Sequence, residues 1–165
     1  MSHQVIVGPT MCGKTTLAMG FASQWLANGR KVLVCDPLQS DWPATWQTTD
    51  RAALVALAKR SLGCALICDE AGQTIARDPE AEWLVTTARH WGHKTTILSH
   101  GGTQMTPTMR GQFSTVFLFG STPRVAELWA EEFNEPGLLH AVTLPRFEYL
   151  VKTRYQPLRR QILTA

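Results

Sequence analysis

Residues 6–18, IVGPTMCGKTTLA, constrain the fold more than any other stretch of the chain, because residues 8–15 match the pattern G-x-x-x-x-G-K-[ST]. Gly8 and Gly13 allow a tight turn in which successive backbone N–H groups point inward, toward phosphate oxygens. The run HQVIV before the turn is typical of a buried strand, and KTTLAMGFASQWLANG after it of an amphipathic helix ending near Asn28. Strand, turn and helix in register predict a nucleotide-binding loop rather than a chance match.

The chemistry of this loop predicts two cofactors, ATP and Mg²⁺. Lys14 can reach the β- and γ-phosphates, and the hydroxyl of Thr15 is placed to ligate Mg²⁺. The helix that begins near Lys14 adds the positive end of its dipole to the same place. The residues expected to bind the nucleotide are Gly8, Pro9, Thr10, Met11, Cys12, Gly13, Lys14, Thr15 and Thr16.

Length and composition favour one globular domain over residues 1–165, since 44% of the residues are hydrophobic. No run approaches the roughly 18 apolar residues of a membrane span, and the early first strand leaves no room for a signal peptide. The four cysteines contain no C-x-x-C pair, and His90 and His93 have no cysteine nearby, so no zinc site is predicted. A reduced, cytosolic setting is expected.

Six strand-like runs alternate with helical patterns along the chain. The runs are HQVIVG, KVLVCD, GCALICDE, KTTILSH, STVFLFG and FEYLVK. The helical patterns cover 14–28, about 50–61, about 79–91 and about 123–133. Continuous Val/Ile/Leu strands predict an α/β fold of the P-loop sandwich type, with a mostly parallel central sheet and helices on both faces. Ligands of such sheets bind beyond the carboxyl ends of the strands.

Residues 38–49, LQSDWPATWQTT, form the least regular segment. Its tryptophans, Trp42 and Trp46, could present a surface to DNA, but tryptophans in such loops more often cover the edge of the core. We therefore expect both to be packing residues.

Positive charge is concentrated at the end of the chain. Residues 146–165 contain five Lys or Arg and one Glu, a net +4, whereas the rest contains eleven basic and twelve acidic residues, a net −1. This basic segment could contact a phosphate backbone or be a solvated tail, and the sequence favours neither.

The run CALICDEAG predicts the second half of the nucleotide site. Asp69 at the end of this strand is expected to hold Mg²⁺ through water, opposite Thr15. Glu70, the next residue, is placed to orient or deprotonate an attacking water. An acid aimed at water favours hydrolysis, because a kinase must keep water away from the γ-phosphate.

The segment TARHWGHKTTILSHGGTQMTPTMRG supplies further candidate catalytic residues. Its strand ends in a polar tip, Ser99-His100, that would face the γ-phosphate, and Gln104 follows in a glycine-rich turn. Arg89 and Arg110 flank this strand, and each could stabilise transition-state charge or be an ordinary surface cation.

Taken in order, these elements resemble the FtsK–HerA group of DNA-pumping ATPases, in particular the small packaging ATPases of tailless, membrane-containing phages of the tectivirus kind. The similarity covers about residues 3–120. It is carried by GPTMCGKTT, KVLVCDP with Asp36 at the strand tip, ALICDEAG, and ARHWGHKTTILSHGGTQMTPTMRGQFSTVFLF. That group commonly has glutamine at the polar strand tip; here His100 takes the position, and Gln104 is the alternative phosphate sensor.

The resemblance implies a motor that packages a viral genome into a preformed capsid. It implies a ring, with six subunits expected, in which an arginine from a neighbour, with Arg89 preferred over Arg110, completes each ATP site. Double-stranded DNA would pass through the pore, held by its phosphate backbone in a salt-sensitive way, since no extra domain for reading sequence is evident. Capsid vertex proteins are further expected partners, and the host cytoplasm or the packaging vertex of the virion the expected location.

Two alternatives stay open. A P-loop nucleoside kinase resembling thymidine kinase has a similar loop, but that family has a C-x-x-C zinc knuckle that this sequence lacks. A nucleotide-gated assembly or secretion factor resembling the zonula-occludens-toxin-like proteins of filamentous phages would usually carry a membrane segment.

Overall fold

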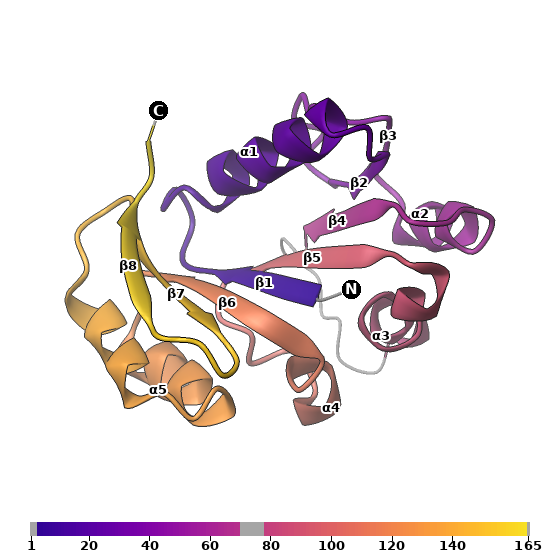
Figure 1. The fold of residues 1–165 in the computed structure, drawn as a ribbon. Helices are drawn as coiled ribbons and strands as arrows, with labels where there is room; N and C mark the ends of the chain where they lie inside the picture. The colour runs from indigo at the N-terminus through magenta and orange to yellow at the C-terminus, as the bar shows by residue number, and fades with distance from the viewer. Residues whose placement is uncertain (1–2, 70–77, 165) are drawn as a thin grey trace.

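The computed structural model describes residues 3–69 and 78–164, and their strands form one sheet in the order β3-β2-β4-β5-β1-β6-β7-β8 (Figure 1). The pairs from β3 through β6 are parallel, and β7 and β8 add antiparallel strands at one edge. The strands are β1 His3–Val7, β2 Val32–Cys35, β3 Trp46–Thr48, β4 Ala65–Asp69, β5 Lys94–Ser99, β6 Phe113–Phe119, β7 Glu148–Thr153 and β8 Arg159–Ile162.

Helices cover both faces of this sheet, which confirms the predicted fold class. Helix α1 lies on one face, and α2 to α5 lie on the other (Figure 1). The helices are α1 Lys14–Ala27, α2 Arg51–Ala58, α3 Pro79–Thr86, α4 Pro107–Arg110 and α5 Pro123–Glu132, with 3₁₀ segments η1 Ala88–Trp91 and η2 Pro136–Thr143.

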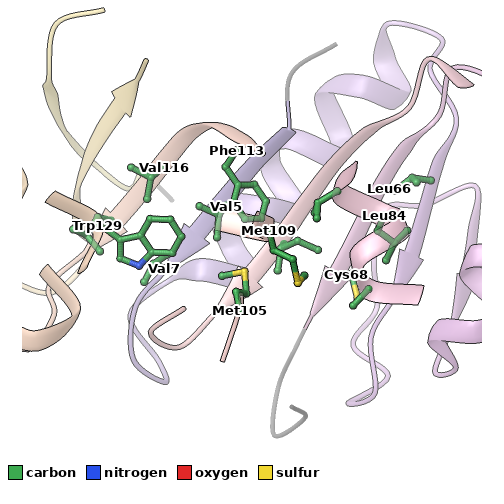
Figure 2. Close-up of a cluster of buried hydrophobic side chains, with 14 of the residues drawn as sticks. Val5, Val7, Leu66, Cys68, Leu84, Met105, Met109, Phe113, Val116 and Trp129 are labelled. Carbon is green, nitrogen blue, oxygen red and sulfur yellow. The ribbon is translucent and has the colours of Figure 1, made fainter. Parts of the chain in front are cut away.

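The strands alternate between two hydrophobic cores because successive side chains point to opposite faces. In β1, Val5 and Val7 pack into the larger core under α2 to α5, whereas Ile6 packs into the smaller core under α1. Figure 2 shows the larger core, where Trp129 of α5 and Phe113 of β6 lie over the central strands. Burial on both faces explains why these strands read as continuous apolar runs.

The predicted elements exist, but one predicted helix is divided, and β3, β8, α4 and η2 were not predicted. Asp78 and Thr122 cap α3 and α5 as expected, their side chains accepting from the backbone N–H groups of Glu80 and Val125. The single helix predicted over 79–91 is wrong: α3 ends at Thr86, and a separate 3₁₀ turn follows. Strands β3 and β8 were not predicted, because they are short edge strands with polar residues and little apolar periodicity.

Both tryptophans of the irregular segment are packing residues, as expected. Trp42 is buried and its indole Nε1 donates to Asp36 Oδ2 at 2.8 Å. Asp36 also accepts from the backbone N–H groups of Leu38 and Ser40, so it holds the turn after β2 together. Trp46 lies in β3 and packs against the larger core.

The basic C-terminal segment folds into the β7–β8 hairpin, so its interpretation as a solvated tail is wrong. Carboxylates neutralise several of its cations. The ion pairs are Lys152 with Glu135 at 3.1 Å, Arg154 with Glu132 at 3.5 Å and Arg160 with Glu148 at 2.8 Å.

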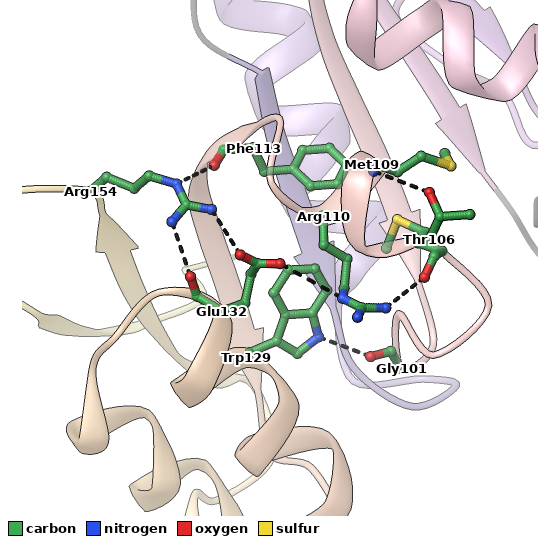
Figure 3. A network of polar contacts seen from close by, with 9 residues as sticks. Gly101, Thr106, Met109, Arg110, Phe113, Trp129, Glu132 and Arg154 are labelled. Carbon is green, nitrogen blue, oxygen red and sulfur yellow. Dashed lines mark hydrogen bonds and ion pairs between the residues drawn. The ribbon is translucent and has the colours of Figure 1, made fainter.

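Glu132 at the end of α5 joins this hairpin to the central sheet (Figure 3). It pairs with Arg154 of the hairpin and, at 3.8 Å, with Arg110 of α4. Arg110 also donates to the carbonyl of Met105 at 2.6 Å, and Arg154 to the carbonyl of Phe113 at 2.9 Å. The two arginines therefore connect α4, α5, β6 and β7.

His3, the first residue of β1, makes the stability of the fold depend on pH. Its Nδ1 accepts from the backbone N–H of Thr95 at 2.9 Å. Burial, assisted by the charge of Arg89, lowers the pKa of His3 from 6.5 to about 4. The unfolded chain therefore takes up this proton first as the pH falls, and stability present above pH 6.5 is lost progressively toward pH 4.

Because the pKa of His3 is lowered in the folded protein, the free energy of unfolding should fall by about 2 kcal/mol between pH 7 and pH 5. This figure uses about 1.36 kcal/mol for each unit of pKa shift. Urea denaturation of the wild type and of His3→Asn at both pH values measures the difference. The variant should be less stable at pH 7 but lose less on acidification. Equal losses would show that His3 does not resist protonation.

Candidate nucleotide-binding site

The loop after β1 has the conformation that phosphate binding requires. Its Met11 and Gly13 have positive φ angles of 64° and 110°, which turn the backbone back on itself. Gly8 is tightly enclosed: a Cβ there would lie 2.7 Å from Cys12 Sγ and 2.8 Å from Phe119 Cβ. Burial raises the pKa of the Cys12 thiol, so an uncharged sulfur packs beneath the loop.

Lys14, the first residue of α1, is buried and folds back over this loop. Its Nζ donates to the carbonyls of Gly8 at 2.6 Å and Pro9 at 2.9 Å. The ammonium group is thereby held at the N-terminal end of a 14-residue helix whose first turn carries no acidic residue. Both the charge and the helix dipole favour an anion at this position.

Asp69 and the loop lie at the same edge of the sheet, the carboxyl edge. Asp69 ends β4 and pairs in register with Leu98 of β5, and the next residue of β5, Ser99, pairs with Val7 of β1. The backbone N–H of Gly8 then donates to the Ser99 carbonyl at 3.1 Å. One intervening strand thus separates the carboxylate from the start of the phosphate loop.

The donor chemistry at this edge fits Mg²⁺. Thr15 supplies a partly exposed hydroxyl in the first turn of α1, and Asp69 a partly exposed carboxylate. Within residues 3–69 and 78–164, no three His, Cys, Asp or Glu side chains gather to hold a metal ion. Mg²⁺ usually takes one or two protein oxygens together with waters and substrate phosphates, so a hydroxyl and a carboxylate of this kind fit its requirements.

His100 and Gln104 are placed differently. His100 follows β5 directly and lines a cavity with Pro9, Thr10 and Met11 of the loop. Gln104 is exposed in the following turn and is not among the residues lining that cavity. The structure therefore brings His100, rather than Gln104, to the nucleotide site. Whether His100 senses the phosphate stays a prediction.

Neither predicted arginine lies in the nucleotide site of its own chain. Arg89 precedes β5, at the opposite edge of the sheet, where it contacts Gln112 and the carbonyl of Val85. Arg110 is held in the Glu132 network described above. Glu70, the predicted catalytic base, lies outside the described residues.

Arg146 and Phe147 are site residues that the sequence did not identify. They precede β7 and reach the phosphate loop, where Arg146 Nε donates to the Met11 carbonyl at 3.2 Å. The guanidinium carbon lies 4.5 Å from the centre of the Phe147 ring. Both residues line a cavity of about 780 Å³ beside the loop and a smaller one of about 270 Å³ over Lys14, Thr15 and Thr16.

The larger cavity adjoins the phosphate loop and has an apolar wall. That wall is formed by Phe119 and Gly120 at the end of β6, Pro123 and Val125 of α5, Val142 of η2, and Leu144 and Pro145 directly after η2. An apolar cavity with a few polar groups at one end is typical of a small-molecule site. A planar base could enter it while the phosphates rest on the loop.

No protein-family model and no curated protein matches this chain. In the described part, no helix is both long and apolar enough to cross a membrane. Solved structures do match over nearly its whole length, at low sequence identity.

The genome packaging NTPase B204 from Sulfolobus turreted icosahedral virus 2, in complex with AMPPCP, matches with a TM-score of 0.80 and 15% identity over 99% of this chain and 98% of its own. B204 from Sulfolobus turreted icosahedral virus, a DNA-packaging ATPase, gives 0.80 and 14% over the same shares. VirB4 of Thermoanaerobacter pseudethanolicus gives 0.74 and 9% over 99% and 90%. The chain therefore has the fold of the viral genome-packaging NTPases, as its resemblance to FtsK–HerA packaging ATPases implied.

Proposed function

We propose that this protein is an ATPase motor that moves double-stranded DNA and packages a viral genome into a preformed capsid. The observation that carries the proposal is the carboxyl edge of the sheet, where Lys14, Thr15, Asp69 and His100 converge on a helix N-terminus. The match to B204, whose solved complexes include AMPPCP and ATP-gammaS, supports ATP as the ligand.

Each residue of this edge has a definite task in the proposed reaction. The loop N–H groups and Lys14 would bind the β- and γ-phosphates, and Thr15 and Asp69 would hold Mg²⁺. When bound, Mg²⁺ neutralises phosphate charge that develops in the transition state. His100 donates to the γ-phosphate, and Glu70 orients the attacking water.

In the proposed ring a neighbouring subunit supplies an arginine finger, since neither Arg89 nor Arg110 lies in the nucleotide site of its own chain. Arg89 lies at the amino edge of the sheet, opposite the nucleotide. A neighbouring subunit that packs the part of this edge around Arg89 and Gln112 against the carboxyl edge of the next would place Arg89 near the γ-phosphate. Such head-to-tail contacts generate closed rings when the rotation allows closure; we propose six subunits.

Phe147 is proposed to stack on the base of the nucleotide. Its ring is fixed by the guanidinium of Arg146 on one side and is 40% exposed toward the cavity. Phe147→Ala should raise KM for ATP about tenfold, because stacking on a base contributes roughly 1–3 kcal/mol, and leave kcat nearly unchanged.

Steady-state kinetics measure that split, with Tyr155→Ala as the control since Tyr155 is a fully exposed aromatic in the distant β7–β8 turn. GTP and ATP should be affected alike, because the cavity wall is largely apolar. A fall in kcat with KM unchanged would place Phe147 in catalysis rather than in base binding.

The decisive experiment for the proposed function measures ATP hydrolysis by the purified protein with and without linear double-stranded DNA. We expect hydrolysis to rise severalfold on adding DNA, and the increase to fall with salt as backbone contacts are screened. Hydrolysis indifferent to DNA would favour the nucleotide-gated assembly factor, and phosphate transfer to a nucleoside the kinase.

A further inference from the structure

The amino edge of the sheet, opposite the nucleotide site, carries a group of basic residues that we call the amino-edge cluster: Arg30, Lys31, Lys59, Arg60 and Lys94. Arg30 and Lys31 precede β2, Lys94 begins β5, and Lys59 and Arg60 follow α2.

Backbone hydrogen bonds bring these segments side by side. The N–H of Ala65 donates to the Lys31 carbonyl at 2.9 Å, and the N–H of Lys94 donates to the Cys64 carbonyl at 3.0 Å. The turn that leads into β4 therefore lies between Lys31 and Lys94, and the end of α2 lies directly before that turn. Residues far apart in sequence form one continuous surface.

A polar cavity of about 500 Å³ opens in the middle of this surface. It is lined by Asn28, Gly29, Arg30, Lys31, Arg60, Ser61, Leu62, Gly63 and Cys64. No carboxylate is among these lining residues. Gly29 and Gly63 have positive φ angles of 81° and 66°, so each lies in a tight turn beside the cations that line the cavity. Lysine and arginine side chains are among the groups that proteins use to bind phosphodiesters.

The charges of the surrounding elements are divided between the two edges. Asp36 follows β2, Asp50 caps α2 and Asp69 ends β4, so these acids lie at the carboxyl edge. At the amino edge the same elements carry lysine and arginine. Among the described residues, none of the ion pairs includes Lys31, Lys59, Arg60 or Lys94.

Aromatic rings hold two cations of the cluster in place. Lys59 Nζ lies 5.4 Å from the centre of the Trp83 ring, and Lys94 Nζ lies 5.5 Å from that of Trp25. Burial, and next the charge of Arg30, lowers the pKa of Lys94. Positive charges are therefore close enough to repel one another, and a bound anion would relieve that repulsion.

We propose that the amino-edge cluster binds the phosphate backbone of duplex DNA. This inference rests on the proposed function and names the surface that contacts its DNA. It assigns the DNA contact to this cluster rather than to the basic C-terminal segment, where Lys152, Arg154 and Arg160 are paired with carboxylates.

Duplex DNA fits this surface better than a protein or a membrane. Leu62 is the one large exposed hydrophobic residue among those lining the cavity. Protein interfaces need a buried apolar centre, and interfacial binding to lipid needs several apolar side chains. Phosphate contacts need neither.

The test uses a double variant, Lys31→Ala with Arg60→Ala, and a matched control, Arg124→Ala with Arg159→Ala. All four residues are exposed and each pair removes two positive charges, but the control residues lie on α5 and β8. Titration of a fluorescent random-sequence duplex from 50 to 200 mM salt gives the affinity and its salt dependence.

The cluster variant should bind DNA about 10- to 100-fold more weakly and reduce the salt slope by about 2, since each phosphate contact contributes about 1 to that slope. Its DNA-stimulated hydrolysis should fall while hydrolysis without DNA stays unchanged, because neither residue lies in the nucleotide site. The control should bind DNA within about twofold of the wild type.

Three results would overturn the inference. Equal DNA affinity of the two variants would mean that DNA binds elsewhere. If DNA still stimulates ATP hydrolysis by the wild type in that case, the proposed function is retained and only the assigned surface is wrong. Loss of hydrolysis without DNA in the cluster variant alone would mean that the cluster faces a neighbour's nucleotide. The third result is that the wild type binds phosphatidylserine vesicles through the cluster but does not bind duplex DNA. It would reject both the proposed DNA-moving function and the proposed DNA contact.

Discussion

Replacing Lys14 by alanine is expected to abolish ATP hydrolysis, with a loss of at least about 10³-fold, and to weaken nucleotide binding strongly. The structure places the Lys14 ammonium over the phosphate loop, within 2.9 Å of two loop carbonyls. A charged donor at that position interacts with the β- and γ-phosphates in the ground state and with the charge that develops during transfer. Titration of a fluorescent ATP analogue and a coupled hydrolysis assay measure the two losses.

Lys14 also packs the loop, so the experiment needs a variant that separates charge from folding. Lys14→Met keeps most of the side-chain volume but removes the ammonium group and with it the hydrogen bonds to the carbonyls of Gly8 and Pro9. It should be as inactive as Lys14→Ala but closer to the wild type in Tm. Arg124→Ala, an exposed cation on α5, controls for a general loss of positive charge. Near-normal turnover by either Lys14 variant would reject the loop as the phosphate site.

The fold could be predicted from the sequence because both the motif and the central strands have strong local signals. The phosphate-loop pattern fixes a strand, a turn and a helix, and β1, β2, β4 and β5 are buried on both faces, so each reads as an apolar run. Edge strands have no such signal. β8 has four exposed residues, and only its pairing with β7 makes it a strand.

The nucleotide site was predictable only where its residues are close to a motif. Lys14, Thr15 and Asp69 belong to patterns that are read locally, whereas Arg146 and Phe147 follow the loop by more than 130 residues. They reach it because β7 pairs with β6, a partner of β1. This is a long-range pairing that periodicity does not reveal. The sequence did contain a weaker signal, since Pro145-Arg146-Phe147 directly precedes a strand.

The distribution of charge shows the same limit. Counting along the chain places the excess of positive charge at residues 146–165, but the folded hairpin pairs several of those cations with Glu132, Glu135 and Glu148. The amino-edge cluster is assembled from three separate segments, none of which is notably basic alone. β4 and β5 begin at this cluster and end at Asp69 and Ser99, so the same two strands connect the proposed DNA and ATP sites.

Glu70→Gln is the second substitution for which a very large effect is expected. Glu70 directly follows Asp69, the carboxylate that ends β4 at the same edge of the sheet as the phosphate loop. Glutamine keeps the size and hydrogen-bonding capacity of glutamate but cannot accept a proton from water. Hydrolysis should therefore fall by about 10²–10⁴, the usual contribution of a general base. Nucleotide affinity should change by less than about threefold.

Comparison with Asp69→Asn makes this prediction specific, because the two acids are expected to fail in different ways. Asp69→Asn should weaken ATP binding in the presence of Mg²⁺ but much less in EDTA, since the task proposed for Asp69 is to hold the metal ion. Glu70→Gln should bind Mg·ATP normally, but the bound ATP should remain unhydrolysed. Single-turnover kinetics can show that the hydrolysis step is slow, rather than the release of products. If Glu70→Gln instead loses nucleotide binding together with turnover, Glu70 has a structural role in the site. Another group must then activate the water. His100, which lines the cavity beside the phosphate loop, would be the first residue to test.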